Sequence, residues 1–229
     1  MTKEYPNALK SIFNGLINLI YPRSCEICSQ GLCEDEEKIY GPLCKSCFDK
    51  IKPAKSHAIH SAKNITVWAA CEYEGMAKNC IHLFKYNNRQ RLSKPLAGLM
   101  SDLANKNPFG EKFDIIIPIP LHRSKMRERG FNQAELLAKN IARSISAPVC
   151  VNALKKVKAT ISQTGLSKTK RFTNLRGTFK ITDNNAVCGR DILLVDDVCT
   201  TGSTINEAAK ILLKSGAKSV KALVLAKGI

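Results

Sequence analysis

No apolar run in the 229-residue sequence approaches the ~18 residues that a membrane-spanning helix needs. The N-terminal segment MTKEYPNALK also lacks the basic stretch and following apolar stretch that mark a secretory signal. We find neither an internal repeat nor a low-complexity tract, so a repeat architecture is not expected. These absences predict a cytoplasmic protein with no membrane span.

Acidic residues are scarce and unevenly placed. The chain has 36 Lys and Arg residues against 19 Asp and Glu residues, a formal net charge of +17. There is no acid between Glu135 and Asp183, and only Glu128 opposes the basic cluster at residues 123–129. Such a field attracts polyanions. A pyrophosphate-bearing substrate, nucleic acid and a merely solvated basic face all stay open. A diphosphate needs only a few cations, so the surplus favours a larger anion as well.

Aromatic residues make up only 6% of the chain, which limits stacking on nucleic-acid bases. Tyr86, Phe131 and Phe172 lie within basic clusters and are candidates for stacking on a single strand. Aromatic residues are more often core or loop-anchor residues, so both roles stay open for each.

Ten cysteines are present, and the cytosol would keep them reduced. Four of them form two Cys-x-x-Cys pairs with fifteen residues between the pairs: Cys25, Cys28, Cys44 and Cys47. This spacing is typical of a structural Zn²⁺ site, because four thiolates leave no open position for catalysis. A redox or incidental cysteine cluster is the alternative. We interpret Cys33, which lies between the pairs, as a bystander.

The sequence predicts two units: a helix plus a zinc-ribbon-like module in residues 1–55, and a larger domain in residues 65–229. A polar linker is expected over residues 52–64. In the larger domain, helix-periodic segments alternate with apolar runs at residues 67–73, 114–119, 149–154, 178–181, 192–195 and 219–225. This alternation predicts an α/β fold with a mostly parallel, doubly wound sheet. Residues 121–131 are expected to form a basic loop, and residues 158–174 a loop long enough to be a lid.

Residues 192–204 (ILLVDDVCTTGST) are the most informative segment. An apolar run predicts a buried strand, and a helix stripe begins at Ile205 and is stopped by Gly216. The turn between them lies where open α/β sheets bind ligands. Its backbone N–H groups, its hydroxyls and the helix dipole suit a phosphate, and Gly202 lets the backbone approach closely.

A ribose 5-phosphate fits this segment, with Asp196 and Asp197 as the catalytic acid pair that accepts hydrogen bonds from ring hydroxyls. The residues expected around the phosphate are Val198, Thr200, Thr201, Gly202, Ser203 and Thr204. The segment resembles the signature of the type I phosphoribosyltransferases: an apolar strand, two acids and a Thr/Ser-Gly-x-Thr turn. An ordinary strand, polar turn and helix is the alternative.

That resemblance implies phosphoribosyl pyrophosphate as the ligand, with Mg²⁺ bridging its pyrophosphate and ribose oxygens. The segment after the strand at residues 114–119 is then placed to hold the pyrophosphate through Leu121, His122, Arg123 and Lys125. The loop at residues 158–174 would exclude water from a cation-like sugar intermediate.

Residues 118–133 (PIPLHRSKMRERGFNQ) resemble the characteristic segment of the ComF family of competence proteins. A second string resembles that family in order: Thr160, Gln163, Thr164, Gly165, Leu166, Ser167, Arg171, Asn174, Gly177 and Phe179. A four-cysteine module ahead of the transferase domain completes the family's domain order. The resemblance implies a bacterial factor for natural transformation that handles incoming single-stranded DNA, with a helicase or membrane channel of the uptake machinery as candidate partners.

Seven basic residues are candidates for binding that DNA: Lys85, Arg89, Arg127, Arg129, Lys168, Lys170 and Arg171. The alternative function is a catalytically active phosphoribosyltransferase of nucleobase salvage, in which the excess positive charge is incidental.

Overall fold

The computed structural model of the protein describes residues 23–55, 58–60, 65–86, 89–106, 108–158 and 177–228. Several predictions fall outside these ranges: the N-terminal helix, nearly all of the lid loop, and the candidates Lys168, Lys170, Arg171 and Phe172.

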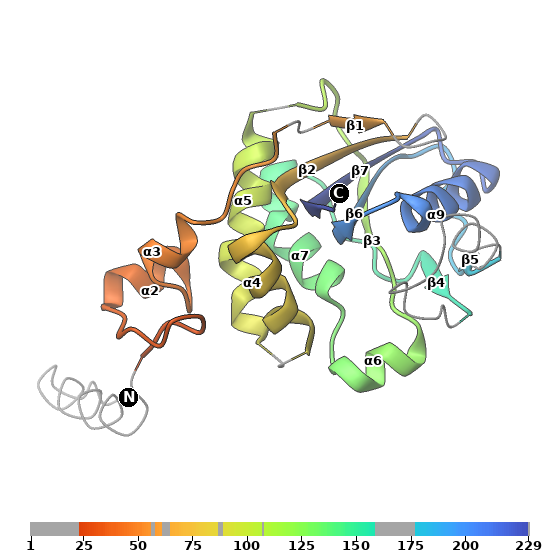
Figure 1. Cartoon of the computed structure of the whole chain (residues 1–229). Helices are drawn as coiled ribbons and strands as arrows, with labels where there is room; N and C mark the ends of the chain where they lie inside the picture. Colours follow the sequence, from red (N-terminus) through yellow and green to blue (C-terminus); the bar gives the residue numbers. More distant parts are fainter. Residues whose placement is uncertain are drawn as a thin grey trace, which may run out of the picture.

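A five-stranded sheet in the order β1-β2-β7-β6-β3 forms the centre of the larger domain (Figure 1). Strands β2 (Thr66–Glu72), β7 (Ser219–Lys227), β6 (Asp191–Cys199) and β3 (Ile115–Pro118) pair in parallel. Strand β1 (Ala58–His60) adds antiparallel to β2 at one edge. The inner strands β6 and β7 are apolar and buried along most of their length, as expected for strands covered on both faces. The predicted mostly parallel sheet is confirmed.

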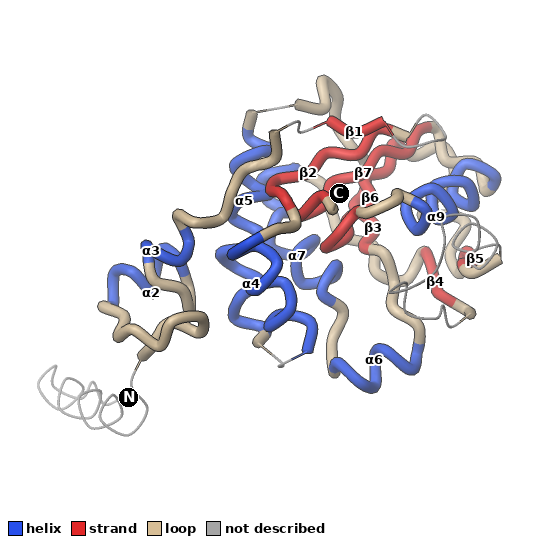
Figure 2. Tube along the Cα trace, in the orientation of Figure 1, coloured by secondary structure: helices blue, strands red, loops and turns tan. Residues whose placement is uncertain are grey.

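Helices cover both faces of this sheet (Figure 2). One face carries α4 (Gly75–Tyr86), the 3-10 helix η1 (Gln90–Leu92), α5 (Ser93–Asn105) and α7 (Gln133–Ile145); the other carries α9 (Ser203–Lys214). Alternate residues of β6 face opposite layers, because successive side chains of a strand point to opposite sides. Leu193 and Val195 belong to the apolar cluster under α4, α5 and α7, whereas Ile192 and Leu194 belong to the cluster under α9. The fold is therefore doubly wound.

Three expectations about strands are corrected. Strands β4 (Leu154–Lys156) and β5 (Phe179–Ile181) pair with each other antiparallel in a separate two-stranded sheet. The strand predicted over residues 149–154 was wrong: Val149 makes only an isolated bridge to Ile116, and β4 begins at Leu154. Strand β1 also lies within the stretch predicted as a linker.

The predicted basic loop after β3 contains a helix, α6 (Arg123–Arg129), so that expectation was wrong. His122 caps its first turn by accepting a hydrogen bond from the backbone N–H of Ser124 at 3.3 Å. Gly130 ends it in a left-handed conformation with φ of 76°. No residue of α6 is buried. The helix predictions relied on apolar residues at helical spacing, and α6 has no buried apolar face that would produce this pattern.

The cysteine module contains α2 (Glu34–Tyr40) and α3 (Lys45–Phe48), which lie beside α4 and α5 (Figure 1). Leu43 and Cys47 of the module share one apolar cluster with Leu96 of α5. Arg91 forms an ion pair with Glu37, and Gly41 packs so closely on Pro95 that an added Cβ would lie 3.0 Å from the Pro95 ring. The module therefore packs directly on the transferase-like domain.

Within the described ranges, none of the helices has the length and apolar character needed to cross a membrane.

Candidate functional site

The carboxyl ends of the four parallel strands meet at one edge of the sheet, where β6 leads through a short turn into α9. Gly202 closes this turn with φ of 70°, and its carbonyl accepts a hydrogen bond from the backbone N–H of Asn206 at 2.8 Å. A small cavity of about 50 Å³ opens here. It is lined by Asp196, Val198, Cys199, Thr200, Thr201, Gly202, Ser203, Thr204 and Ile205. Since one water needs ~10–15 Å³, the cavity has room for a compact anionic group.

The start of α9 suits an anion for reasons of backbone chemistry. The first N–H groups of a helix have no partner within the helix, and the helix dipole places partial positive charge there. The hydroxyl oxygens of Thr201 and Ser203 lie 2.8 Å apart beside these N–H groups. The residues predicted to wrap a phosphate are therefore brought together around one cavity.

The two acids lie on strand β6 itself, which extends beyond the predicted apolar run at residues 192–195. The strand continues to Cys199 because its pairing with β7 continues, with Val198 opposite Ala226 and Cys199 opposite Lys227. As neighbours on a strand, Asp196 and Asp197 point to opposite faces. Asp196 lines the cavity, while Asp197 is buried and lies 2.8 Å from the Lys85 ammonium nitrogen. The two acids are therefore not equivalent.

Asp196 occupies an unusual electrostatic position. Burial, together with the neighbouring Asp197 carboxylate, raises the pKa of Asp196 to about 7. The backbone N–H of Asp197, which donates to Asp196 at 2.8 Å, and the cations of Lys85 and Lys156 act in the opposite direction. Burial alone would lower the pKa of Lys85, but the attraction of Asp197 more than compensates, and its pKa is raised.

Lys156 is a site residue that the sequence analysis missed. Its ammonium nitrogen lies 5.7 Å from the centroid of the Phe179 ring, its partner across the β4–β5 pair. Burial and the nearby charges of Lys125 and Arg129 lower the pKa of Lys156, whereas Asp196 opposes this shift. Lys156 thus lies near the cavity acid, and Lys125 and Arg129 lie near Lys156. Nothing in the sequence separated Lys156 from the other lysines of its region, because the pairing of β4 with β5 that orients it was not predicted.

The predicted pyrophosphate segment lies between β3 and α6. Leu121 and His122 are in the loop, whereas Arg123 and Lys125 lie on the first turn of α6. The backbone N–H of Ile119 donates to the carbonyl of Val195 at 2.8 Å, so this loop starts beside the carboxyl end of β6.

The described DNA-binding candidates differ in their surroundings. Lys85 is 17% exposed and pairs with Asp197, a position that does not favour a role on a DNA-binding surface. Arg89 is exposed and lies 3.9 Å from Glu26, and Arg127 is exposed on α6. Arg129, half-buried, lies over the Tyr86 ring at 5.1 Å from its centroid.

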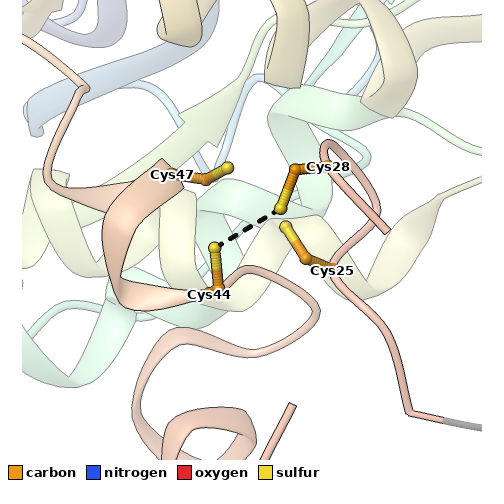
Figure 3. A group of neighbouring side chains, drawn as sticks. All are labelled: Cys25, Cys28, Cys44 and Cys47. Atoms are coloured by element: carbon orange, nitrogen blue, oxygen red, sulfur yellow. Dashed lines mark hydrogen bonds between the residues drawn. The ribbon is translucent and has the colours of Figure 1, made fainter. Parts of the chain in front are cut away.

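The four predicted zinc ligands converge (Figure 3). Their sulfur atoms all lie within 4.8 Å of one another, and those of Cys28 and Cys44 are 3.7 Å apart. Zn–S bonds of ~2.3 Å in a tetrahedron place sulfurs ~3.8 Å apart, so the cluster fits Zn²⁺. Burial raises the pKa of Cys44 and of Cys47, so bound metal would have to displace their protons. The Cys33 sulfur instead caps α2, in agreement with its interpretation as a bystander.

Comparison with known proteins identifies the family. The phosphoribosyl transferase domain family matches residues 85–229. Competence protein F of Haemophilus influenzae is 31% identical over 211 residues, which cover 88% of this chain and 92% of that protein. The chain belongs to the ComF family.

Two further ComF-family relatives span most of the chain. Competence protein ComFC of Bacillus subtilis is 30% identical over 205 residues, covering 82% of this chain and 79% of that protein. DNA utilization protein YhgH of Shigella flexneri is 29% identical over 204 residues, covering 86% of this chain and 87% of that protein. The family resemblance and the fold expected from it are thus confirmed.

Proposed function

We propose that this ComF-family protein is a cytoplasmic competence factor that binds phosphoribosyl pyrophosphate at the carboxyl edge of its sheet and single-stranded DNA on the adjacent basic surface. The names of its relatives support the competence role, since two are competence proteins and one a DNA utilization protein. The cavity at the start of α9, with Asp196 in its wall, is the observation that carries the ligand assignment.

Each part of the ligand has a matching group. The N–H groups and hydroxyls of residues 200–204 would hold the 5-phosphate, and Asp196 would accept a hydrogen bond from a ring hydroxyl. Lys125 and Lys156 would neutralise the pyrophosphate. Mg²⁺ would further screen the pyrophosphate charge, held mainly by the ligand's oxygens and by water. If the bound ligand reacts, transfer of its phosphoribosyl group would depend mainly on positioning the sugar and matching the charge of the leaving pyrophosphate.

Calorimetric titration with phosphoribosyl pyrophosphate and Mg²⁺ tests the ligand site. Asp196→Asn should weaken binding at least about tenfold, since a hydrogen bond to a charged group contributes ~1.5–3 kcal/mol. Asp191→Asn is a matched control, because Asp191 lies at the opposite end of the same strand and pairs with Lys218. Equal affinities of wild type and Asp196→Asn would overturn the assignment.

Transferase turnover in nucleobase salvage is the second candidate function, favoured by the same cavity and acid. Incubation with phosphoribosyl pyrophosphate, Mg²⁺ and a panel of nucleobases would distinguish the two. Pyrophosphate release that depends on one base, without salt-dependent DNA binding, would favour salvage.

A further inference from the structure

Tyr86 ends helix α4 and is 53% exposed. Within the described ranges, the other large apolar side chains of comparable exposure are aliphatic. Phe131, a second stacking candidate from the sequence, is 7% exposed and packs against Phe84 at a centroid distance of 5.6 Å. Phe131 is therefore a core residue, and among the described candidates only Tyr86 presents its ring to solvent.

Arg129 is held in place against this ring. Its guanidinium lies 5.1 Å from the Tyr86 centroid, and its Nη1 donates to Gln133 Oε1 at 3.0 Å. Gln133 is itself buried, and its side-chain amide donates to the carbonyl of Phe84 at 3.4 Å. His82, one turn before Tyr86, contacts the tyrosine ring at a centroid distance of 4.9 Å. The ring and the cation are thus positioned before any ligand binds, which reduces the entropy lost on binding.

Besides Arg129, two exposed arginines lie close to Tyr86 or Arg129 in the sequence. Arg127 lies two residues before Arg129 on α6, and Arg89 lies three residues after Tyr86; both are exposed. An aromatic face beside arginines offers stacking to a base and attraction to a phosphate, the combination with which proteins bind single strands without sequence preference. A double helix hides its base faces and would use only the charges.

We propose that Tyr86, held by Arg129 and flanked by His82, is a base-stacking site for single-stranded DNA. The proposal rests on the DNA binding proposed above and assigns it a location. The site adjoins the ligand cavity, because the preceding residue, Lys85, pairs with Asp197, and because the charge of Arg129 acts on Lys156. A strand stacked on Tyr86 would pass beside the phosphoribosyl site.

Fluorescence anisotropy with the full chain tests this site, using a labelled 20-nucleotide oligo-dT and an abasic oligonucleotide of the same length. Tyr86→Leu should weaken oligo-dT binding about 5- to 140-fold, the effect of losing one stacked base, with no change in the salt slope. Binding to the abasic strand should stay at the wild-type value. Tyr86→Phe keeps the ring and should bind oligo-dT like the wild type.

The outcomes separate this proposal from the one on which it rests. If the wild type binds neither oligonucleotide, the DNA-binding function and the stacking site both fall. If the wild type binds oligo-dT and Tyr86→Leu binds it equally well, only the stacking site is overturned. The thermal unfolding midpoint of Tyr86→Leu should match that of the wild type, since the side chain is exposed. A lowered midpoint together with weakened binding to the abasic strand would mean that the variant is misfolded, and would overturn the proposal.

Discussion

The ammonium nitrogen of Lys85 lies 2.8 Å from a carboxylate oxygen of Asp197, and the two side chains are only 17% and 11% exposed. This pair ties the last turn of α4 to the carboxyl end of β6, beside the ligand cavity. An ion pair at such burial depends on both partners, because removing one leaves the other charged and desolvated.

Lys85→Met should therefore lower the free energy of unfolding by about 3 kcal/mol, measured by urea denaturation at pH 7. Lys85→Met combined with Asp197→Leu removes both charges and should recover most of the loss. Lys52→Met is the matched control: its ion pair with Glu74 is also short, at 2.9 Å, but Lys52 is 73% exposed, so the free energy of unfolding should change little. Equal losses for Lys85→Met and Lys52→Met would contradict this account.

The raised pKa of Asp196, about 7, predicts a pH-dependent stability. An unfolded aspartate titrates near ~3.9, so between pH ~4 and about 7 the folded state binds a proton that the unfolded state has lost. Stability from this group is therefore present at low pH and is lost as pH rises through that window. Burial is the largest cause of the raised folded value; the charge of Asp197 adds to it, and the charges of Lys85 and Lys156 oppose it.

Asp196→Asn cannot ionise, so its stability relative to the wild type should rise from pH 5 to pH 7 and then level off, as measured by denaturation at each pH. The difference in stability between Asp191→Asn and the wild type should stay constant over this range. Hydrogen bonds from Lys218 and Ser219 lower the pKa of Asp191, so its effect on stability changes only below pH ~4. A difference between Asp196→Asn and the wild type that does not vary with pH would refute the prediction.

Zn²⁺ should be present in purified protein and should depend on the four clustered cysteines. Changing Cys25 and Cys44 to Ser should release the metal and destabilise the module, because structural zinc contributes directly to folding. Cys33→Ser should keep the metal, since its sulfur lies at the start of α2. Elemental analysis that finds no metal in the wild type, together with thiol titration that finds disulfides, would exclude this site.

Arg127 should act on DNA through its charge alone. Arg127→Gln should reduce the slope of log affinity against log salt by about 0.7 on single-stranded DNA, the value for one phosphate contact. Lys218→Gln removes the same charge at the amino end of β7 and should leave the slope unchanged. If the two variants behave alike, binding follows net charge and not a located surface.

The sequence was most informative where burial imposes a pattern. The apolar run at residues 192–195 and the helix stripe from Ile205 predicted β6 and α9, because both elements are packed on the core. A helix start has a local signal of its own, since Asn is a preferred capping residue: the side chain of Asn132 caps α7 by accepting a hydrogen bond from the N–H of Ala134 at 3.2 Å.

Helix α6 and the pairing of β4 with β5 were not predicted. Helix α6 exposes its surface, and the β4–β5 pair is too short for its alternation to distinguish an antiparallel pair from strands of the main sheet. The true end of β6 depends on its register with β7, a relationship between distant segments. The Lys85–Asp197 pair likewise joins residues far apart in the sequence, so the sequence did not predict it.

The packing of the cysteine module on α5 has a consequence for the whole molecule. Leu92 and Leu96 are fully buried in the cluster that they share with Leu43 and Cys47. If the metal were removed and the module unfolded, the α5 layer would expose this apolar surface to water, which would favour self-association. Chelation should thus precipitate the entire chain, and not merely loosen one end of it.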